Sequence, residues 1–211
     1  MHKMPQNQTA RYTFYHTFEV GEIGFLLSEK GLEMLDISGL YNTENSGIEL
    51  DSVSKKSLEN SGEVTAVKLE DAPTTTPLMA LKRQIIEEFT DYFAGNLQCF
   101  SIPLNMQGTP FQMAVWQALR NIPYGETINY KMLALNIDNP KAVRAVGSAN
   151  GKNPLPIIIP CHRVIQSDQT LGGYSGGLTT KVNLLKLEGL TLSQGKSGLK
   201  VGIAQSDLFP E

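Results

Sequence analysis

The residues best suited to chemistry lie in one short segment, Pro160-Cys161-His162-Arg163. The thiolate is the reactive form of cysteine, and an adjacent imidazole and guanidinium favour the thiolate over the thiol. Pro160 has no backbone N–H to donate, so it ends the apolar run 157–159, which we expect to be a strand. Position alone leaves open whether Cys161 is a reagent or a small buried hydrophobe, as most free cysteines are.

Glu188 is the third residue that suits an activated thiol. It belongs to the apolar stripe of a helix expected over 180–188, so its side chain points inward where the helix dipole disfavours an anion. Such a carboxylate needs a partner, and His162 is the one histidine of the carboxy-terminal half. We therefore predict a His162–Glu188 hydrogen bond, with a partly exposed Glu at a frayed helix end as the alternative. Cys161, His162 and Glu188 then have the composition of nucleophile, base and orienting carboxylate.

Two further segments have patterns that favour binding. Residues 172–177, Gly-Gly-Tyr-Ser-Gly-Gly, lack the spacing of a dinucleotide loop, and their glycines suggest a pocket wall where backbone approaches a ligand. Short helices expected over 130–135 and 140–149 have the helix-turn-helix pattern, with Asn139 capping the second. That second helix has small side chains and one long one, Arg144, which suits close approach to a partner. A plain packing helix explains the same residues equally well.

The elements that position these residues divide the chain into two halves. At 211 residues it can bury one large core or two modest ones. We expect an α+β protein with a domain over 1–102, in which 41–77 is loop and linker, a mostly helical domain over 103–192, and a tail over 193–211. In the first domain, alternation and apolar stripes predict strands over 12–20, 24–28, 32–37 and 64–69 and a helix over 77–93.

Charge and composition exclude some classes of protein. Residues 1–102 hold 8 Lys and Arg against 15 Asp and Glu, whereas residues 103–211 hold 10 against 6, a distribution that permits a polyanion partner for the second half. The sequence has no apolar run of about 18 residues, so we expect no membrane span. Its first residues lack the apolar core of a signal peptide. The two cysteines form no C-x-x-C pair, so we expect reduced thiols in the cytoplasm and no structural zinc site.

These motifs together resemble one family, the O6-alkylguanine-DNA alkyltransferases, also called methylated-DNA–protein-cysteine methyltransferases. The resemblance implies a ribonuclease H-like first domain and a winged-helix-like DNA-binding domain that carries the Pro-Cys-His-Arg site, with no cofactor and no metal. The matching segments are Gly108-Thr109-Pro110-Phe111-Gln112, Ile122-Pro123-Tyr124-Gly125-Glu126-Thr127, Arg144-Ala145-Val146-Gly147, Asn153-Pro154, Ile159-Pro160-Cys161-His162-Arg163-Val164 and Gly173-Tyr174-Ser175-Gly176-Gly177.

The resemblance also implies catalytic roles. Cys161 would accept the alkyl group from guanine O6 in an irreversible reaction that uses up the protein. His162 would take the thiol proton through a water, oriented by Glu188. Asn153 would brace the turn beside the site. Tyr130 would help to rotate the nucleotide's phosphate and would protonate guanine N3 as the base leaves.

Other residues would hold the DNA. Arg144 would enter the duplex and occupy the space of the extruded guanine, whereas Arg163 is expected to hold the two halves of the protein together. The residues implied to touch the DNA backbone, besides Tyr130, are Lys131, Asn139 and Ser167. The residues implied to line the base pocket are Val164, Tyr174, Ser175 and Gly176.

The expected partner is double-stranded DNA with O6-alkylguanine, bound from the minor groove by a monomer, and O4-alkylthymine is a second candidate substrate. A damage sensor or helix-turn-helix regulator would explain the DNA-binding face without chemistry, and a Cys-His hydrolase would use the same thiol with turnover. A sensor of this kind typically has Trp at the position of Cys161, so the cysteine favours alkyl transfer.

Overall fold

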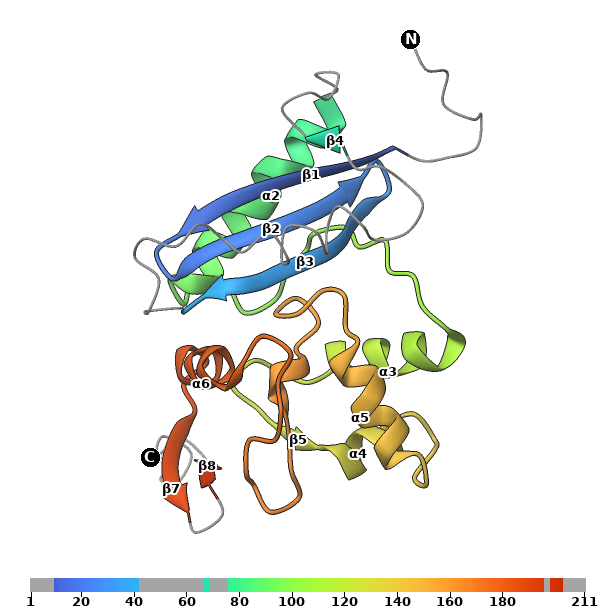
Figure 1. Ribbon diagram of the computed structural model, residues 1–211, viewed down its shortest axis with the longest axis vertical. Helices are drawn as coiled ribbons and strands as arrows, with labels where there is room; N and C mark the ends of the chain where they lie inside the picture. The colour runs from blue at the N-terminus through green and yellow to red at the C-terminus, as the bar shows by residue number, and fades with distance from the viewer. Residues whose placement is uncertain (1–9, 42–66, 69–75, 196–197, 203–211) are drawn as a thin grey trace, which may run out of the picture. The chain divides into compact units, whose positions relative to one another are not determined.

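The computed structural model describes residues 10–41, 67–68, 76–195 and 198–202. They belong to two compact units, one drawn from Met1–Tyr92 and Phe100–Met106 and the other from Phe93–Cys99 and Gln107–Glu211. Strands and helices occur in both units, so the α+β class is confirmed (Figure 1).

The first unit is built on a four-stranded sheet in the order β3-β2-β1-β4. Its central strands are antiparallel, and β4 pairs in parallel with β1. Gly31 begins β3 with a φ of +134°, and a Cβ there would lie 2.5 Å from the carbonyl oxygen of Pro103, so only glycine fits. The strands are β1 (Arg11–Phe18), β2 (Gly21–Ser28), β3 (Gly31–Leu40) and β4 (Val67–Lys68).

One long helix, α2 (Thr76–Phe93), covers a face of this sheet (Figure 1). Four residues of its predicted apolar stripe are buried, and they are Leu78, Leu81, Ile85 and Phe89. The ring of Phe89 lies 5.5 Å from that of Phe25 on β2, edge to face, which is a favourable aromatic geometry. Helix and sheet therefore share an aromatic core.

The first unit extends past residue 102, where we placed its end. Leu32 on β3 donates its N–H to the carbonyl of Pro103 at 2.9 Å, and its own carbonyl accepts from the N–H of Asn105 at 2.8 Å. Segment 103–105 thereby satisfies backbone groups at the edge of the sheet, which hydropathy patterns do not register.

The second unit is mostly helical, as expected, with short strand pairs. Helix α3 (Pro110–Arg120) begins with a capping box. The Thr109 side chain accepts from the N–H of Gln112, and the Gln112 side chain accepts from the N–H of Thr109. Helices α4 and α5 pack on α3 and on each other. The helices are α3 (Pro110–Arg120), α4 (Tyr130–Asn136), α5 (Val143–Gly151) and α6 (Leu178–Leu187).

The second helix of the predicted helix-turn-helix begins later than expected. Asn139 does not cap it, because the carbonyl of Asn139 accepts from the N–H of Ala142 at 3.0 Å and closes a separate turn. Helix α5 starts at Val143, and its N-cap, Ala142, makes no side-chain cap hydrogen bond.

The predicted isoleucine strand at 157–159 is wrong. Ile157 has a φ of 75°, so the backbone turns there, and residues 156 and 159 meet in an isolated bridge. Asn153 stabilises this bend, since its Nδ2 donates to the Ile159 carbonyl at 2.7 Å and its Oδ1 accepts from the N–H of Leu155 at 3.0 Å. The apolar run is buried as a loop, which periodicity cannot distinguish from a buried strand.

A hairpin forms where a tail was expected. Strands β7 (Thr191–Gly195) and β8 (Gly198–Gly202) pair antiparallel, so they cross the predicted boundary at residue 192. Val201 of β8 is buried in a small core with Ile165, Leu171, Leu185 and Leu190. Among the helices that the structure describes, none is long and apolar enough to cross a membrane.

Candidate active site

Cys161 begins a single 3₁₀ turn, η2 (Cys161–Arg163), that leads into β6 (Val164–Ile165). Strand β6 pairs in parallel with β5 (Ile128–Asn129). A 3₁₀ helix has about three residues per turn, so consecutive side chains point in three different directions. The side chains of the turn are all buried, yet they have different surroundings.

A cavity of about 290 Å³ opens onto Cys161, whose exposed fraction is 1%. Helices α4 and α5, the turn η2 and the glycine-rich loop 172–177 build its walls, so the predicted pocket-wall role of that loop agrees with the geometry. The residues that line it are Tyr130, Gly147, Asn150, Gly151, Cys161, Gly173, Tyr174 and Ser175. Two predicted pocket residues, Val164 and Gly176, are not among them; Val164 is fully buried in β6.

His162 and Arg163 converge on Glu188. His162 Nε2 lies 2.8 Å from Glu188 Oε1, so the predicted hydrogen bond is confirmed. Arg163 donates to both carboxylate oxygens, from Nε and from Nη2, each at 2.8 Å. Burial alone would raise the pKa of Glu188, but the hydrogen bonds and charges of His162 and Arg163 together lower it to about 2. The carboxylate is therefore ionised.

Arg163 also contacts a second segment of the same unit. Its third hydrogen bond runs from Nη1 to the carbonyl of Ile122 at 2.6 Å, and Glu188 and Ile122 both belong to the second unit. The described contacts of Arg163 thus tie the segment before β5 and the end of α6 to the active turn, inside one unit. The bidentate geometry suits a guanidinium better than an ammonium.

His162 is arranged as a neutral base. Because Nε2 faces an ionised carboxylate, we assign its proton to Nε2, which leaves Nδ1 as an acceptor. Burial lowers the pKa of His162, although Glu188 acts in the opposite direction. Nδ1 is buried and has no partner among the described residues. An unprotonated ring nitrogen without a protein partner is free to take a proton.

Cys161 is not a resting thiolate in this environment. Its full burial raises the pKa of the thiol, and the opposing effects of Asn153, Lys181 and Tyr174 are smaller. Arg163 forms its ion pair with Glu188. Neighbouring charge favours the thiolate less than burial disfavours it, so reaction requires a base.

Lys181 on α6 is a residue that the motifs did not identify. It is completely buried, and its Nζ donates to the carbonyls of Val164, at 2.7 Å, and Leu171. Burial lowers its pKa to about 8, and the neighbouring Cys161 opposes that shift. Lys181 lies seven residues before Glu188, on the same inward-facing stripe of the helix. Helical spacing was therefore the one feature of the sequence that could have predicted its burial.

Tyr130 contributes the wall opposite the glycine-rich loop. It is the first residue of α4, and the side chain of Asn129 caps that helix by accepting from the N–H of Met132 at 2.9 Å. Burial raises the pKa of Tyr130, and Cys161 adds to the shift. The phenol is therefore a proton donor at neutral pH.

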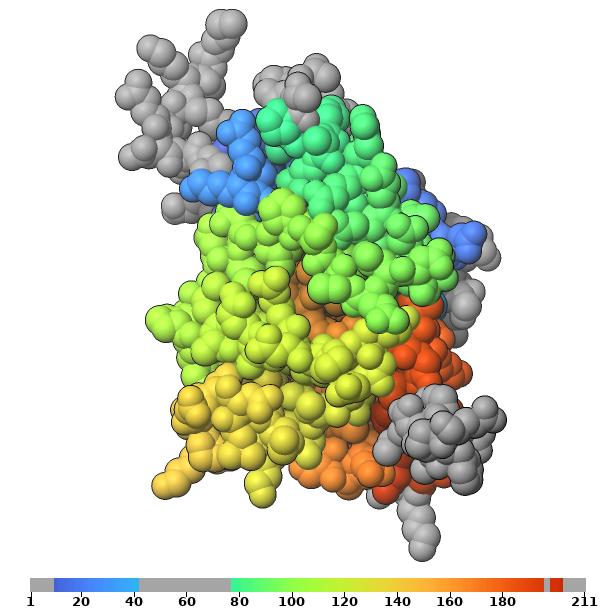
Figure 2. Space-filling view, turned by 180° about the vertical axis from the view of Figure 1, so that it is seen from behind, coloured from blue at the N-terminus to red at the C-terminus, as the bar shows by residue number. Residues whose placement is uncertain are grey.

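Apart from Tyr130, the residues expected to hold DNA are exposed and do not line the cavity. Arg144, Lys131 and Asn139 are exposed on the segment that contains α4 and α5, which forms the yellow to gold outer surface in Figure 2. Ser167 is also exposed and lines a second, larger groove of about 570 Å³.

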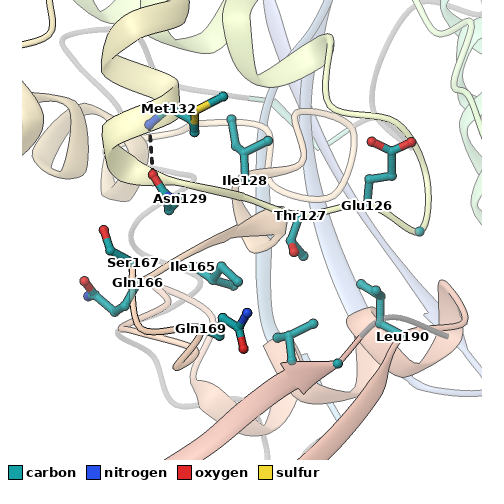
Figure 3. A pocket seen from close by; sticks show the side chains of 13 residues that line it. Glu126, Thr127, Ile128, Asn129, Met132, Ile165, Gln166, Ser167, Gln169 and Leu190 are labelled. Carbon is teal, nitrogen blue, oxygen red and sulfur yellow. Dashed lines mark hydrogen bonds between the residues drawn. The ribbon is translucent and has the colours of Figure 1, made fainter.

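This second groove does not contain the thiol. Figure 3 shows Asn129 and Met132 on one wall and Ser167 and Gln169 on another, with Leu190 at the far end. Among the residues that line it, Glu126 is the ionisable one, and neither Cys161 nor His162 is among them, so the groove lacks the thiol and imidazole of the first cavity. Within the described ranges, no cluster of three or more His, Cys, Asp or Glu side chains is arranged to hold a metal ion.

Comparisons with known proteins agree on one family. A family model described as 6-O-methylguanine DNA methyltransferase, DNA binding domain, matches residues 110–190. The chain is similar to the methylated-DNA–protein-cysteine methyltransferase of Haemophilus influenzae, at 60% identity over 101 residues, which are 47% of this chain and 56% of that relative. It is also similar to the constitutive methylated-DNA–protein-cysteine methyltransferase of Bacillus subtilis, at 49% identity over 120 residues, 56% of this chain and 71% of the relative.

The fold is similar to a solved structure as well. The crystal structure of Mycobacterium tuberculosis OGT in complex with DNA matches with a TM-score of 0.64 and 33% identity, over 84% of this chain and 92% of that one. Since the second unit holds only about half of the residues, this match includes residues of both units. By contrast, the sequence match spans little more than half of the Haemophilus relative's length.

Proposed function

The chain belongs to the methylated-DNA–protein-cysteine methyltransferase family, and from this premise we propose that it repairs DNA by moving an alkyl group from guanine O6 to the sulfur of Cys161. One observation carries the proposal. The thiol lies in the wall of a cavity, next to a histidine that an ionised carboxylate orients. Nucleophile, base and orienting group are thus assembled at a site that water barely reaches.

The transfer is a displacement at the alkyl carbon. The S–C bond to Cys161 forms as the C–O6 bond breaks, and the thiol proton passes to Nδ1 of His162 through a water. Because burial keeps the resting thiol protonated, this proton transfer accompanies the attack. Tyr130 donates a proton to N3 of the departing guanine, and the imidazolium then returns its proton to the phenolate. Burial raises the pKa of Tyr130, so the phenol holds the proton that it donates.

The product is a thioether, which no group in the cavity can cleave. Each protein molecule therefore reacts once. Asn153 supports the reaction by holding the bend before Cys161, and Tyr174 and Ser175 line the cavity that would receive the base. O4-alkylthymine is a further candidate for the same cavity.

The base must leave the duplex before it can react. Cys161 is 1% exposed, so a stacked base cannot reach it, and extrusion costs a few kcal/mol. Arg144 would fill the vacated space, and its exposure on α5, the helix that also supplies Gly147 and Asn150 to the cavity wall, supports this role. Minor-groove binding follows from the small side chains of α5. Contacts of Lys131, Asn139 and Ser167 with the DNA backbone complete the interface.

The finer architecture belongs to the same proposal. We take the first unit as a ribonuclease H-like domain and the second unit as a winged-helix-like DNA-binding domain with a helix-turn-helix in α4 and α5. The protein would act as a monomer in the cytoplasm on double-stranded DNA. The packing of α4 against α5 supports the helix-turn-helix.

Peptide mass spectrometry tests the function directly. The protein is mixed with a duplex containing O6-methylguanine, and we expect one methyl group, located on Cys161. Cys99 is exposed and is the matched control, so Cys99→Ala retains the label and Cys161→Ala loses it. More than one methyl transferred per protein, or a label that survives Cys161→Ala, would refute the proposal.

A further inference from the structure

Strand β8 of the carboxy-terminal hairpin lies beside the segment that follows β6. The N–H of Val201 donates to the carbonyl of Gln169 at 3.1 Å, and the N–H of Leu171 donates to the carbonyl of Leu199 at 3.3 Å. An isolated antiparallel bridge lies between these two hydrogen bonds. The backbone of β8 is therefore attached to residues 169–171.

The turn at residues 166–170 connects β6 to that attached segment. The N–H of Gln166 donates to the carbonyl of Thr170 at 2.9 Å, and Oδ1 of Asp168 accepts from the N–H of Thr170 at 3.0 Å. The side chains of residues 166–169 are exposed, so their own burial contributes little to fixing the turn. Its position in the second unit therefore depends on the strands at its base.

Val201 connects β8 to the small core beneath this turn. Its exposed fraction is 9%, and it is buried there together with Ile165, Leu171, Leu185 and Leu190. Ile165 precedes the turn and Leu171 follows it. The same core thus anchors β8 and both ends of the turn.

We infer that Val201 is a positioning residue for DNA binding, because it keeps β8 against the turn 166–170 and so holds Ser167 where it contacts the DNA backbone. The inference rests on the proposed function, in which Ser167 makes that contact. Ser167 is exposed, and a hydroxyl can donate to a phosphate oxygen. A hydrogen bond weakens steeply outside a narrow range of distance and angle, so a displaced turn loses the contact. No residue of β8 lines the cavity that contains the thiol.

The variant Val201→Asp tests this role, since an unpaired carboxylate is costly to bury and should detach β8 from the core. Leu199→Asp is the matched control, because it adds the same charge to the same strand at a side chain that is 38% exposed. Single-turnover transfer to Cys161 is measured at increasing concentrations of a duplex containing O6-methylguanine, and separately with the free base O6-benzylguanine.

The effect should fall on duplex binding alone. Relative to Leu199→Asp, Val201→Asp should raise the half-saturating duplex concentration by about fivefold, as expected for the loss of one hydrogen bond. The limiting rate and the rate with the free base should stay unchanged. Val201→Ile, which remains apolar, should behave as the wild type does. Val201→Ala should give a weaker form of the same pattern and replaces the Asp variant if that variant does not fold.

A double-mutant cycle shows whether Val201 acts through Ser167. Ser167→Ala by itself should also raise the half-saturating duplex concentration. In the Val201→Asp background it should add almost nothing, because both changes remove the same contact. Effects of the two changes that multiply, or no effect of Ser167→Ala, would overturn the inference.

The remaining outcomes separate the inference from the function on which it rests. An unchanged half-saturating concentration in the Val201 variants refutes the positioning role and leaves the function intact. Equal slowing of the duplex and free-base reactions also refutes it, because β8 would then support the cavity itself. If the wild type transfers no alkyl group to Cys161 from either substrate, the proposed function is refuted, and the inference with it.

Discussion

Replacing Glu188 by Gln removes the negative charge that His162 and Arg163 share. The carboxylate accepts three hydrogen bonds at 2.8 Å from these two residues, and its side chain is completely buried. A glutamine offers one acceptor and brings an NH₂ donor toward the donors of Arg163. The variant therefore leaves a buried guanidinium without a counterion.

The structure gives the size of the effect. The pKa of Glu188 is about 2 against an ordinary 4.5, and one pKa unit corresponds to about 1.4 kcal/mol, so ionisation of Glu188 contributes about 3 kcal/mol at neutral pH. Removal of one partner from a buried ion pair typically costs about 3–5 kcal/mol. Both figures predict a loss of about 3–5 kcal/mol in the free energy of unfolding.

The pH dependence has a definite sign. A carboxyl whose folded pKa is depressed stabilises the fold above its unfolded pKa, near 4.5, and loses that contribution as the pH falls toward 2. The stability difference between wild type and Glu188→Gln is therefore full at neutral pH and shrinks on acidification through this window.

Urea unfolding at several pH values measures this difference. Trp116 is the single tryptophan and is buried in α3, where its Nε1 donates to the Ala149 carbonyl, so its fluorescence reports on the second unit. Glu126→Gln, a change at an exposed carboxylate of the same unit, should stay within about 0.5 kcal/mol of the wild type. A loss below about 1 kcal/mol for Glu188→Gln at neutral pH, or a difference that does not shrink in acid, contradicts the reasoning.

Three further predictions concern the reaction. The rate of thiol loss measures both reactions of Arg144→Ala. The variant should slow repair in duplex DNA by at least tenfold more than it slows reaction with the free base O6-benzylguanine. An equal slowing of the two reactions would exclude a role of Arg144 in the duplex. Lys181→Met removes a cation beside the thiol, so the pH–rate profile for alkylation of Cys161 should shift to higher pH, and an unshifted profile would show that its charge is not felt. Because burial lowers the pKa of His162, repair should not decline between about pH 7.5 and 6.5 through imidazole protonation. His162→Ala should slow transfer at all these values, and a decline in the wild type that His162→Ala abolishes would contradict this assignment.

Burial gives the thiol two opposed properties. It excludes water from the sulfur and so favours displacement, yet it also raises the pKa of Cys161 and keeps the thiol protonated. The buried His162–Glu188 pair resolves the conflict, because a neutral imidazole held by an ionised carboxylate can take the proton at the moment of attack.

The sequence by itself determined the chemistry of the site and much of its framework. Pro160-Cys161-His162-Arg163 carries the nucleophile and the base in adjacent positions, and helical spacing placed Glu188 inward, so the contact with His162 was predictable. The apolar stripe of α2 was equally plain. Local patterns determine such features because they depend on residue type and on a period of 3.6 or 2.

Tertiary structure decided what those patterns could not. The run 157–159 became a bend because Asn153 bonds to the backbone of Leu155 and Ile159, and strands β7 and β8 paired where Val201 is buried in a core formed by distant segments. Likewise, the raised pKa of Cys161 and the burial of Lys181 depend on desolvation, which is a property of the assembled site. The residue types determine which groups can react, and the packing determines the dielectric environment in which they react.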